Sequence, residues 1–111
     1  MGAMNVMDTY EMNNKNESKK NLKTYKLLIS GRVQGVGFRY FAEDKARILQ
    51  INGYVRNTID NKVEILCQGY EPNIDTFIKQ MQRGPTFANV KDIKITEIKD
   101  AQIFNSFEIK F

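Results

Sequence analysis

The sequence predicts a single two-layer α+β domain in which two helices cover one face of a sheet. Hydrophobic periodicity changes along the chain in the order strand, helix, strand, strand, helix, strand, with a short fifth strand at the end. Only two segments have the pattern of amphipathic helices, and two helices can cover only one face of such a sheet. The length of 111 residues fits one domain, because domains cluster around ~100–150 residues.

The first part of this pattern predicts a strand and a helix. Tyr25, Leu27 and Ile29 fall on one face of an extended chain. This alternation predicts a strand over residues 24–30. Apolar side chains then recur at helical spacing, which predicts a first helix over residues 38–50.

A hairpin, a second helix and two more strands follow. Residues 51–58 and 62–69 predict two short strands joined by a tight turn. Residues 71–84 carry apolar side chains at i, i+3, i+4 and i+7, which predicts the second helix. Alternation over residues 90–98 and 106–111 predicts two further strands. This order is that of a ferredoxin-like sandwich, βαββαβ with a short fifth strand, and we expect its antiparallel sheet to be covered on one face by the two helices.

The predicted fold brings two distant segments together. In a split strand-helix-strand unit the first two strands run parallel, so their carboxyl ends share one edge of the sheet. The loop after Ile29 and the residues near Asn57 should therefore meet at that edge. Only the third strand lies between them, so about two strand spacings of ~4.8 Å separate them.

The composition excludes several kinds of chemistry. The chain has no histidine, which excludes a Ser-His-Asp triad, a Cys-His pair and a histidine-ligated metal. A single cysteine cannot form a disulfide framework, and no apolar run approaches the ~20 residues of a membrane helix. We therefore expect a cytoplasmic protein without membrane contact. The net charge of +4 favours anionic partners only weakly.

The first 22 residues differ from the rest of the chain. They are rich in Met, Asn and Lys and show no apolar periodicity, which predicts a disordered N-terminal extension. The initial sequence MGAM resembles a cloning scar. We expect the folded domain to span residues 23–111.

A glycine-rich loop separates the first predicted strand from the first predicted helix. Three glycines lie within seven residues, from Gly31 to Gly37, and Arg32 and Arg39 flank them. Exposed loop amides, the amino end of a helix and a bidentate guanidinium together favour an anion. The spacing of these residues is equally well explained if the glycines only permit a tight connection between the strand and the helix, with both arginines exposed to solvent. Neither GxxxxGK[ST] nor GxGxxG matches this loop.

The motif GRVQGVGFR, followed by GYVRN, resembles the acylphosphatase family over about residues 24–111. The resemblance implies that Arg39 binds substrate, that Asn57 orients a water molecule and that Thr58 supports Asn57. Asn61 stands where the family usually has a glycine, and asparagine tolerates the left-handed backbone that this turn needs. By position, the implied phosphate-binding loop comprises Gly31, Arg32, Val33, Gln34, Gly35, Val36, Gly37 and Phe38.

The implied activity is metal-free hydrolysis of acyl phosphates to a carboxylate and inorganic phosphate, by in-line attack of water. Such an enzyme is a hydrolase acting on acid anhydrides. The leaving carboxylate has a pKa of ~4 and departs without a proton, so the reaction needs no general acid and suits a chain without histidine. Transition-state charge lies on the phosphoryl oxygens, which loop amides and Arg39 can stabilise. We expect no cofactor, and inorganic phosphate or sulfate as the bound anion.

Other phosphatase designs do not match the sequence. A cysteine nucleophile needs an arginine six residues later, but Asn73 lies at that distance from Cys67. Cys67 alternates with Val63 and Ile65 and is expected in the core. No two aspartates form the Asp-x-Asp pair of a phosphoaspartate enzyme, and no carboxylate cluster suits a metal.

Two non-enzymatic alternatives remain in view. RNA-recognition domains share the element order and stack bases on aromatic residues of their first and third strands, but the third strand here has none and the first has only Tyr25. The second alternative is a partner-dependent role, because similar domains form part of hydrogenase-maturation carbamoyltransferases. The presence of both Arg39 and Asn57 argues against a degenerate enzyme. We expect a monomer that acts on small-molecule acyl phosphates and does not bind nucleic acid.

Overall fold

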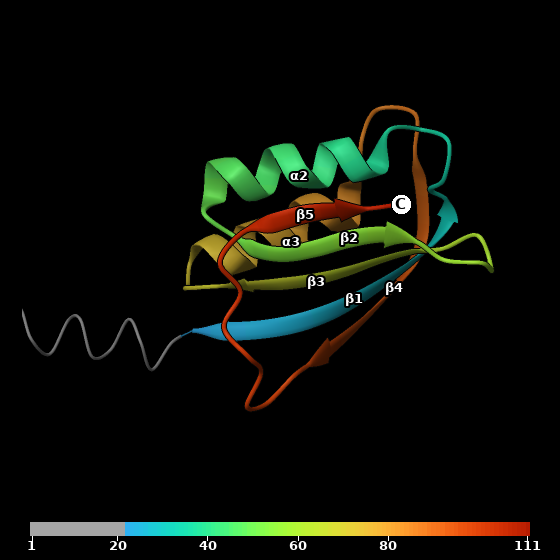
Figure 1. The fold of residues 1–111 in the computed structure, drawn as a ribbon. Coiled ribbons are helices and arrows are strands. Elements are labelled where there is room, and N and C mark those ends of the chain that lie inside the picture. Colours follow the sequence, from blue (N-terminus) through green and yellow to red (C-terminus); the bar gives the residue numbers. More distant parts are fainter. Residues whose placement is uncertain (1–21) are drawn as a thin grey trace, which may run out of the picture.

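The computed structural model describes residues 22–111, and two helices lie against one face of a five-stranded sheet (Figure 1). The elements in chain order are β1 Lys23–Arg32, α2 Phe38–Leu49, β2 Asn52–Asn57, β3 Val63–Gly69, α3 Asn73–Arg83, β4 Asn89–Glu97 and β5 Phe107–Lys110. This order confirms the predicted ferredoxin-like sandwich. The predicted N-terminal extension falls on residues that, apart from Leu22, lie outside the described part of the chain. It therefore stays a prediction.

The strands are arranged in the order β4-β1-β3-β2-β5. The first four run antiparallel to their neighbours, as expected. The fifth departs from the expected antiparallel sheet, because β5 pairs parallel to β2. The reason is the long connection after β4, which carries the chain from one edge of the sheet to the other and reverses its direction (Figure 1).

The core lies between the sheet and the two helices. One row of the register across the sheet contains only aliphatic side chains: Ile95, Leu27, Ile65, Val55 and Ile109. Helix α2 buries Phe38, Ala42 and Ala46, which recur every four residues. Helix α3 buries Ile74, Phe77 and Met81, which are spaced three and four residues apart. Cys67 is fully buried in this core, which confirms its predicted position. No helix in residues 22–111 is long and apolar enough to span a membrane.

The carboxyl ends of β1 and β2 lie on the same side of the sheet, as the topology predicts. Val63 of β3 pairs with Ile29 of β1 on one side and with Asn57 of β2 on the other. The glycine-rich loop and Asn57 are therefore separated by two strand spacings. The β2–β3 turn takes the expected conformation, since Asn61 has a φ of 68°.

Candidate active site

The loop between β1 and α2 begins with a kink that only glycine permits. The pairing of β1 with β4 shifts register between Ser30 and Gly31, and Gly31 has a φ of 123°. A Cβ atom at Gly31 would lie 2.2 Å from the backbone oxygen of Asn89. This irregularity bends the end of β1 just before the loop, while Gly31 and Arg32 remain paired with β4.

The later glycines shape the loop through their backbone conformation. Gly35 and Gly37 have φ values of 74° and 79°, and nothing lies within 4 Å of a Cβ placed on either. Gly37 is the N-cap of α2 and therefore offers no capping side chain. The first amide groups of α2 have no acceptor within the helix, and the helix dipole is positive at this end. Both features favour an anion here.

Three segments meet around a small cavity of about 110 Å³. They are the β1–α2 loop, the first turn of α2 and the last residue of β2. A water molecule occupies about 30 Å³ in the liquid, so the cavity has the volume of roughly four water molecules. It is therefore large enough for one tetrahedral oxyanion. The cavity is lined by Val33, Gly35, Gly37, Phe38, Arg39, Tyr40 and Asn57.

The structure thus brings together both residues to which the family resemblance assigns a catalytic role, Arg39 and Asn57. Four predicted loop residues line the same cavity: Val33, Gly35, Gly37 and Phe38. The other predicted site residues do not line it: Gly31, Arg32, Gln34, Val36 and Thr58. Tyr40 lines it although it is outside the predicted set.

The Arg39 guanidinium packs against the last residue of the chain. Its central carbon lies 4.6 Å from the centroid of the Phe111 ring, a cation–π contact. The parallel pairing of β5 beside β2 brings the end of the chain to this guanidinium. The contact restricts the Arg39 side chain, and we did not predict it from the sequence.

Gln34 connects the loop to the β2–β3 turn. Its side-chain amide nitrogen donates hydrogen bonds to the backbone oxygens of Thr58, at 2.9 Å, and Lys62, at 2.8 Å. These two residues close the turn that immediately follows Asn57. Gln34 therefore fixes the position of the loop relative to the strand that carries Asn57.

Thr58 stabilises the same turn. The backbone N–H of Lys62 donates to the Thr58 hydroxyl oxygen at 2.9 Å, and the backbone N–H of Thr58 donates to the Lys62 oxygen at the same distance. The Thr58 hydroxyl also donates to Asp60 and lowers the pKa of that exposed carboxyl below its ordinary value. Thr58 thus holds the turn beside Asn57.

Among residues 22–111, no group of three or more His, Cys, Asp or Glu side chains is placed to hold a metal ion. The chemistry available at the cavity comes from Arg39, the Asn57 amide and backbone amides. This set can bind a phosphoryl group and position a water molecule.

Comparisons with known proteins identify the family of this chain. The acylphosphatase family model matches residues 25–109. An acylphosphatase from Bacillus licheniformis is 41% identical over 87 residues, which are 78% of this chain and 97% of that protein. The crystal structure of acylphosphatase from Bacillus subtilis has a TM-score of 0.77 and 38% identity, and the match covers 81% of this chain and 99% of that chain.

A second kind of structure is also similar. The crystal structure of HypF from T. kodakarensis has a TM-score of 0.71 and 33% identity, over 80% of this chain but 12% of that chain. The two acylphosphatases named above match over nearly their whole length. The chain therefore belongs to the acylphosphatase family, whose function is the hydrolysis of acyl phosphates.

Proposed function

We propose that the cavity between the β1–α2 loop and the end of β2 binds the phosphoryl group of an acyl phosphate, and that water attacks the phosphorus there in line without a metal ion. The observation that carries this proposal is that Arg39 and Asn57 line one cavity together with Gly35 and Gly37 of the loop. These residues are far apart in the sequence, and only the fold joins them.

Arg39 and the backbone amides stabilise the phosphoryl oxygens. A guanidinium presents several N–H donors in one plane and can hold two oxygens of a phosphoryl group at once. The amino end of α2 adds its own amides and a positive dipole. In the transition state of phosphoryl transfer, negative charge is spread over the three equatorial oxygens, and these donors stabilise it.

Asn57 orients the attacking water. A side-chain amide does not accept a proton near neutral pH, but its oxygen and nitrogen can each hold a water molecule in one orientation. The proton then passes to a phosphoryl oxygen or to bulk solvent. This role contributes positioning, which lowers the barrier by fixing the geometry before reaction.

The bond that breaks lies between phosphorus and the carboxyl oxygen of the substrate. The carboxylate leaves with the electron pair of that bond, and its low basicity means that no acid has to protonate it. A chain without histidine can therefore complete the reaction.

The remaining proposals concern the form in which the enzyme acts. Residues 23–111 form the catalytic unit, which acts as a monomer in the cytoplasm on small-molecule substrates. Inorganic phosphate, the product, and sulfate compete for the cavity because both are tetrahedral oxyanions. The single free cysteine supports a reducing compartment.

The test is hydrolysis of benzoyl phosphate in excess EDTA by the wild type and by Asn57→Ala, with Asn105→Ala as a control. Asn105 is exposed in the connection before β5 and does not line the cavity. We expect EDTA-resistant turnover by the wild type and the control, and a loss of about 10²–10³ in kcat for Asn57→Ala. The inhibition constant of inorganic phosphate should stay within about twofold.

Two results would contradict the proposal. Loss of wild-type turnover in EDTA would show that a metal takes part. An equal loss of phosphate binding and turnover in Asn57→Ala would mean that Asn57 binds the phosphoryl group instead of orienting water.

A further inference from the structure

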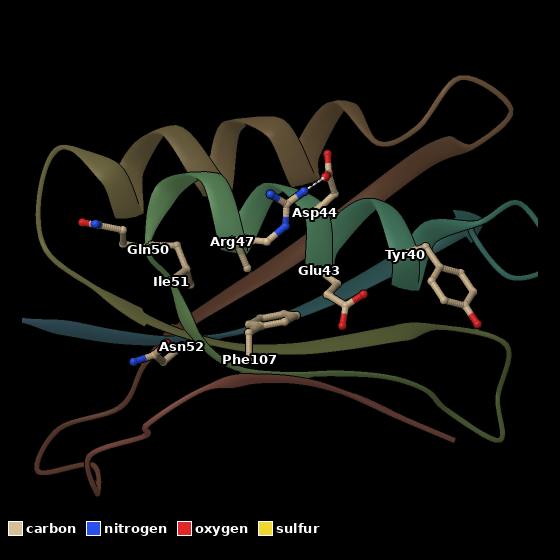
Figure 2. Close-up of a pocket in the computed structure, with 9 residues that line it drawn as sticks. Tyr40, Glu43, Asp44, Arg47, Gln50, Ile51, Asn52 and Phe107 are labelled. Carbon is tan, nitrogen blue, oxygen red and sulfur yellow. Dashed lines mark hydrogen bonds and ion pairs between the residues drawn. The ribbon is translucent and has the colours of Figure 1, made fainter.

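A groove of about 680 Å³ lies along α2, between the helix and the edge of the sheet formed by β2 and β5 (Figure 2). Its size is in the range of small-molecule binding sites, ~300–1,000 Å³. Buried Ile51 and half-buried Phe107 give it apolar walls. Glu43, Asp44 and Arg47 line it from the helix.

The groove adjoins the phosphoryl cavity. Tyr40 lines both spaces, and Glu43 follows Arg39 by one helical turn, a rise of about 6 Å. The phosphoryl cavity, at about 110 Å³, is too small to hold a phosphoryl group and an aromatic acyl group together. An acyl group that extends past Tyr40 would enter the groove.

The groove carries one carboxylate without an ion-pair partner. Asp44 is paired with Arg47, three residues later on the same helix. Within the described chain, Glu43 has no basic group within 4 Å. Figure 2 shows its carboxylate directed from α2 toward the sheet edge where Phe107 lies. The groove is therefore negative, next to a cavity made positive by Arg39.

We propose, on the basis of the function proposed above, that the groove binds the acyl part of the substrate and that Glu43 favours acyl groups that carry a positive charge, as in an aminoacyl phosphate. The substrate would lie with its phosphoryl group at Arg39 and its cationic group about one helical turn along α2. An acidic acyl group would be disfavoured, because two negative charges would lie close together in the groove.

The test compares two substrates of the same shape, 4-(trimethylammonio)benzoyl phosphate and 4-tert-butylbenzoyl phosphate. They differ by one positive charge, and the para position carries that charge toward Glu43. For each enzyme variant, the ratio of kcat/KM for the cationic substrate to that for the neutral substrate is measured at low salt. Because the intrinsic reactivity of each substrate is the same for every variant, it cancels when the ratios are compared. Acetyl phosphate, which is too short to enter the groove, is measured alongside.

Three variants make the comparison specific. In Glu43→Gln the ratio should fall about three- to fivefold, the size of one exposed ion pair, and in Glu43→Lys it should fall further. Glu71→Gln makes the same charge change at an exposed position outside the groove and should keep the wild-type ratio. Raising the salt concentration should reduce the wild-type ratio toward that of Glu43→Gln.

An unchanged ratio in both Glu43 variants, with acetyl phosphate still hydrolysed, would overturn this inference and leave the proposed function intact. The inference is also overturned if Glu71→Gln changes the ratio as much as Glu43→Gln does, because the effect would then come from net charge. If the wild type hydrolyses neither acetyl phosphate nor the benzoyl substrates, the proposed function itself fails and this inference fails with it.

Discussion

The hydrogen bonds of Gln34 make a specific prediction about how loop position controls turnover. Gln34→Ala removes one side-chain amide nitrogen and with it two hydrogen bonds, to the backbone oxygens of Thr58 and Lys62. Both oxygens keep another partner in the turn, since Thr58 also accepts from the N–H of Asn61 and Lys62 from that of Thr58. The variant therefore leaves no acceptor unpaired.

The expected loss of stability follows from that geometry. Each lost bond costs about 0.5–1.5 kcal/mol, so the free energy of unfolding should fall by about 1–3 kcal/mol. For a domain of this size, each kcal/mol lowers the Tm by about 4–8 °C. Turnover should fall by about tenfold or more, because small displacements of catalytic groups have large effects on rate.

Gln34→Glu is the sharper test because it keeps the shape of the side chain. The carboxylate would face two carbonyl oxygens without a proton to donate, and it would place a negative charge beside a cavity that binds an anion. We expect a lower Tm and a lower kcat/KM than in Gln34→Ala. Gln82→Glu, an exposed change on α3, controls for the added charge.

Thermal unfolding followed by circular dichroism and kcat/KM for benzoyl phosphate measure the two effects. The reasoning is refuted if Gln34→Glu matches the wild type in both. If Gln34→Ala loses stability but keeps full turnover at a temperature where it is folded, Gln34 is only structural and does not position the site.

Three more predictions follow from other contacts. In Phe111→Ala, Arg39 loses the ring against which it packs. We expect kcat/KM to fall by about two- to fivefold, which corresponds to the free energy of an exposed cation–π contact. An unchanged kcat/KM would show that the ring has no role in turnover. Desolvation raises the pKa of Glu64, but the hydrogen bond from Tyr54 and neighbouring positive charges outweigh it and hold that pKa below its ordinary value of 4.5. Stability from Glu64 is then present above about pH 4.5 and lost as pH falls through the folded-state pKa, so Glu64→Gln should flatten the acid limb of a plot of unfolding free energy against pH. Burial raises the pKa of the Cys67 thiol to about 12. A disulfide reagent at pH 8 should therefore label this thiol only after denaturation. Rapid labelling of the folded protein would contradict the burial of Cys67.

Much of the fold could be predicted because its elements have regular periodicity. The core faces of α2 and β1 follow from the spacing of apolar residues such as Ala42, Ala46 and Leu27, which the structure buries. The meeting of the loop with Asn57 also followed from topology alone. Any split strand-helix-strand unit with this strand order brings those two ends together.

The parts that could not be predicted depend on long-range register. The direction of β5 is set by the path of the connection after β4, which carries no regular pattern, so the contact between Phe111 and Arg39 was not foreseen. Gln34 lies 24 and 28 residues from its two partners, and local sequence does not show which backbone oxygens it will reach. Tyr40 could be placed on α2, but not at the boundary between two cavities.

These long-range contacts have a common consequence for catalysis. Because the chain has no histidine whose pKa could be shifted for catalysis, the proposed site depends mainly on the relative position of Arg39 and Asn57. That position is held by β3 between the two strands, by Gln34 across the loop and by Phe111 against the guanidinium. Gln34 and Phe111 are not among the buried core residues, so loosening either of these two supports leaves the core buried. A displacement of about 1 Å between reacting groups costs on the order of 10²-fold in rate. Turnover should therefore fall in variants of Gln34 and Phe111 even at temperatures where the domain remains folded.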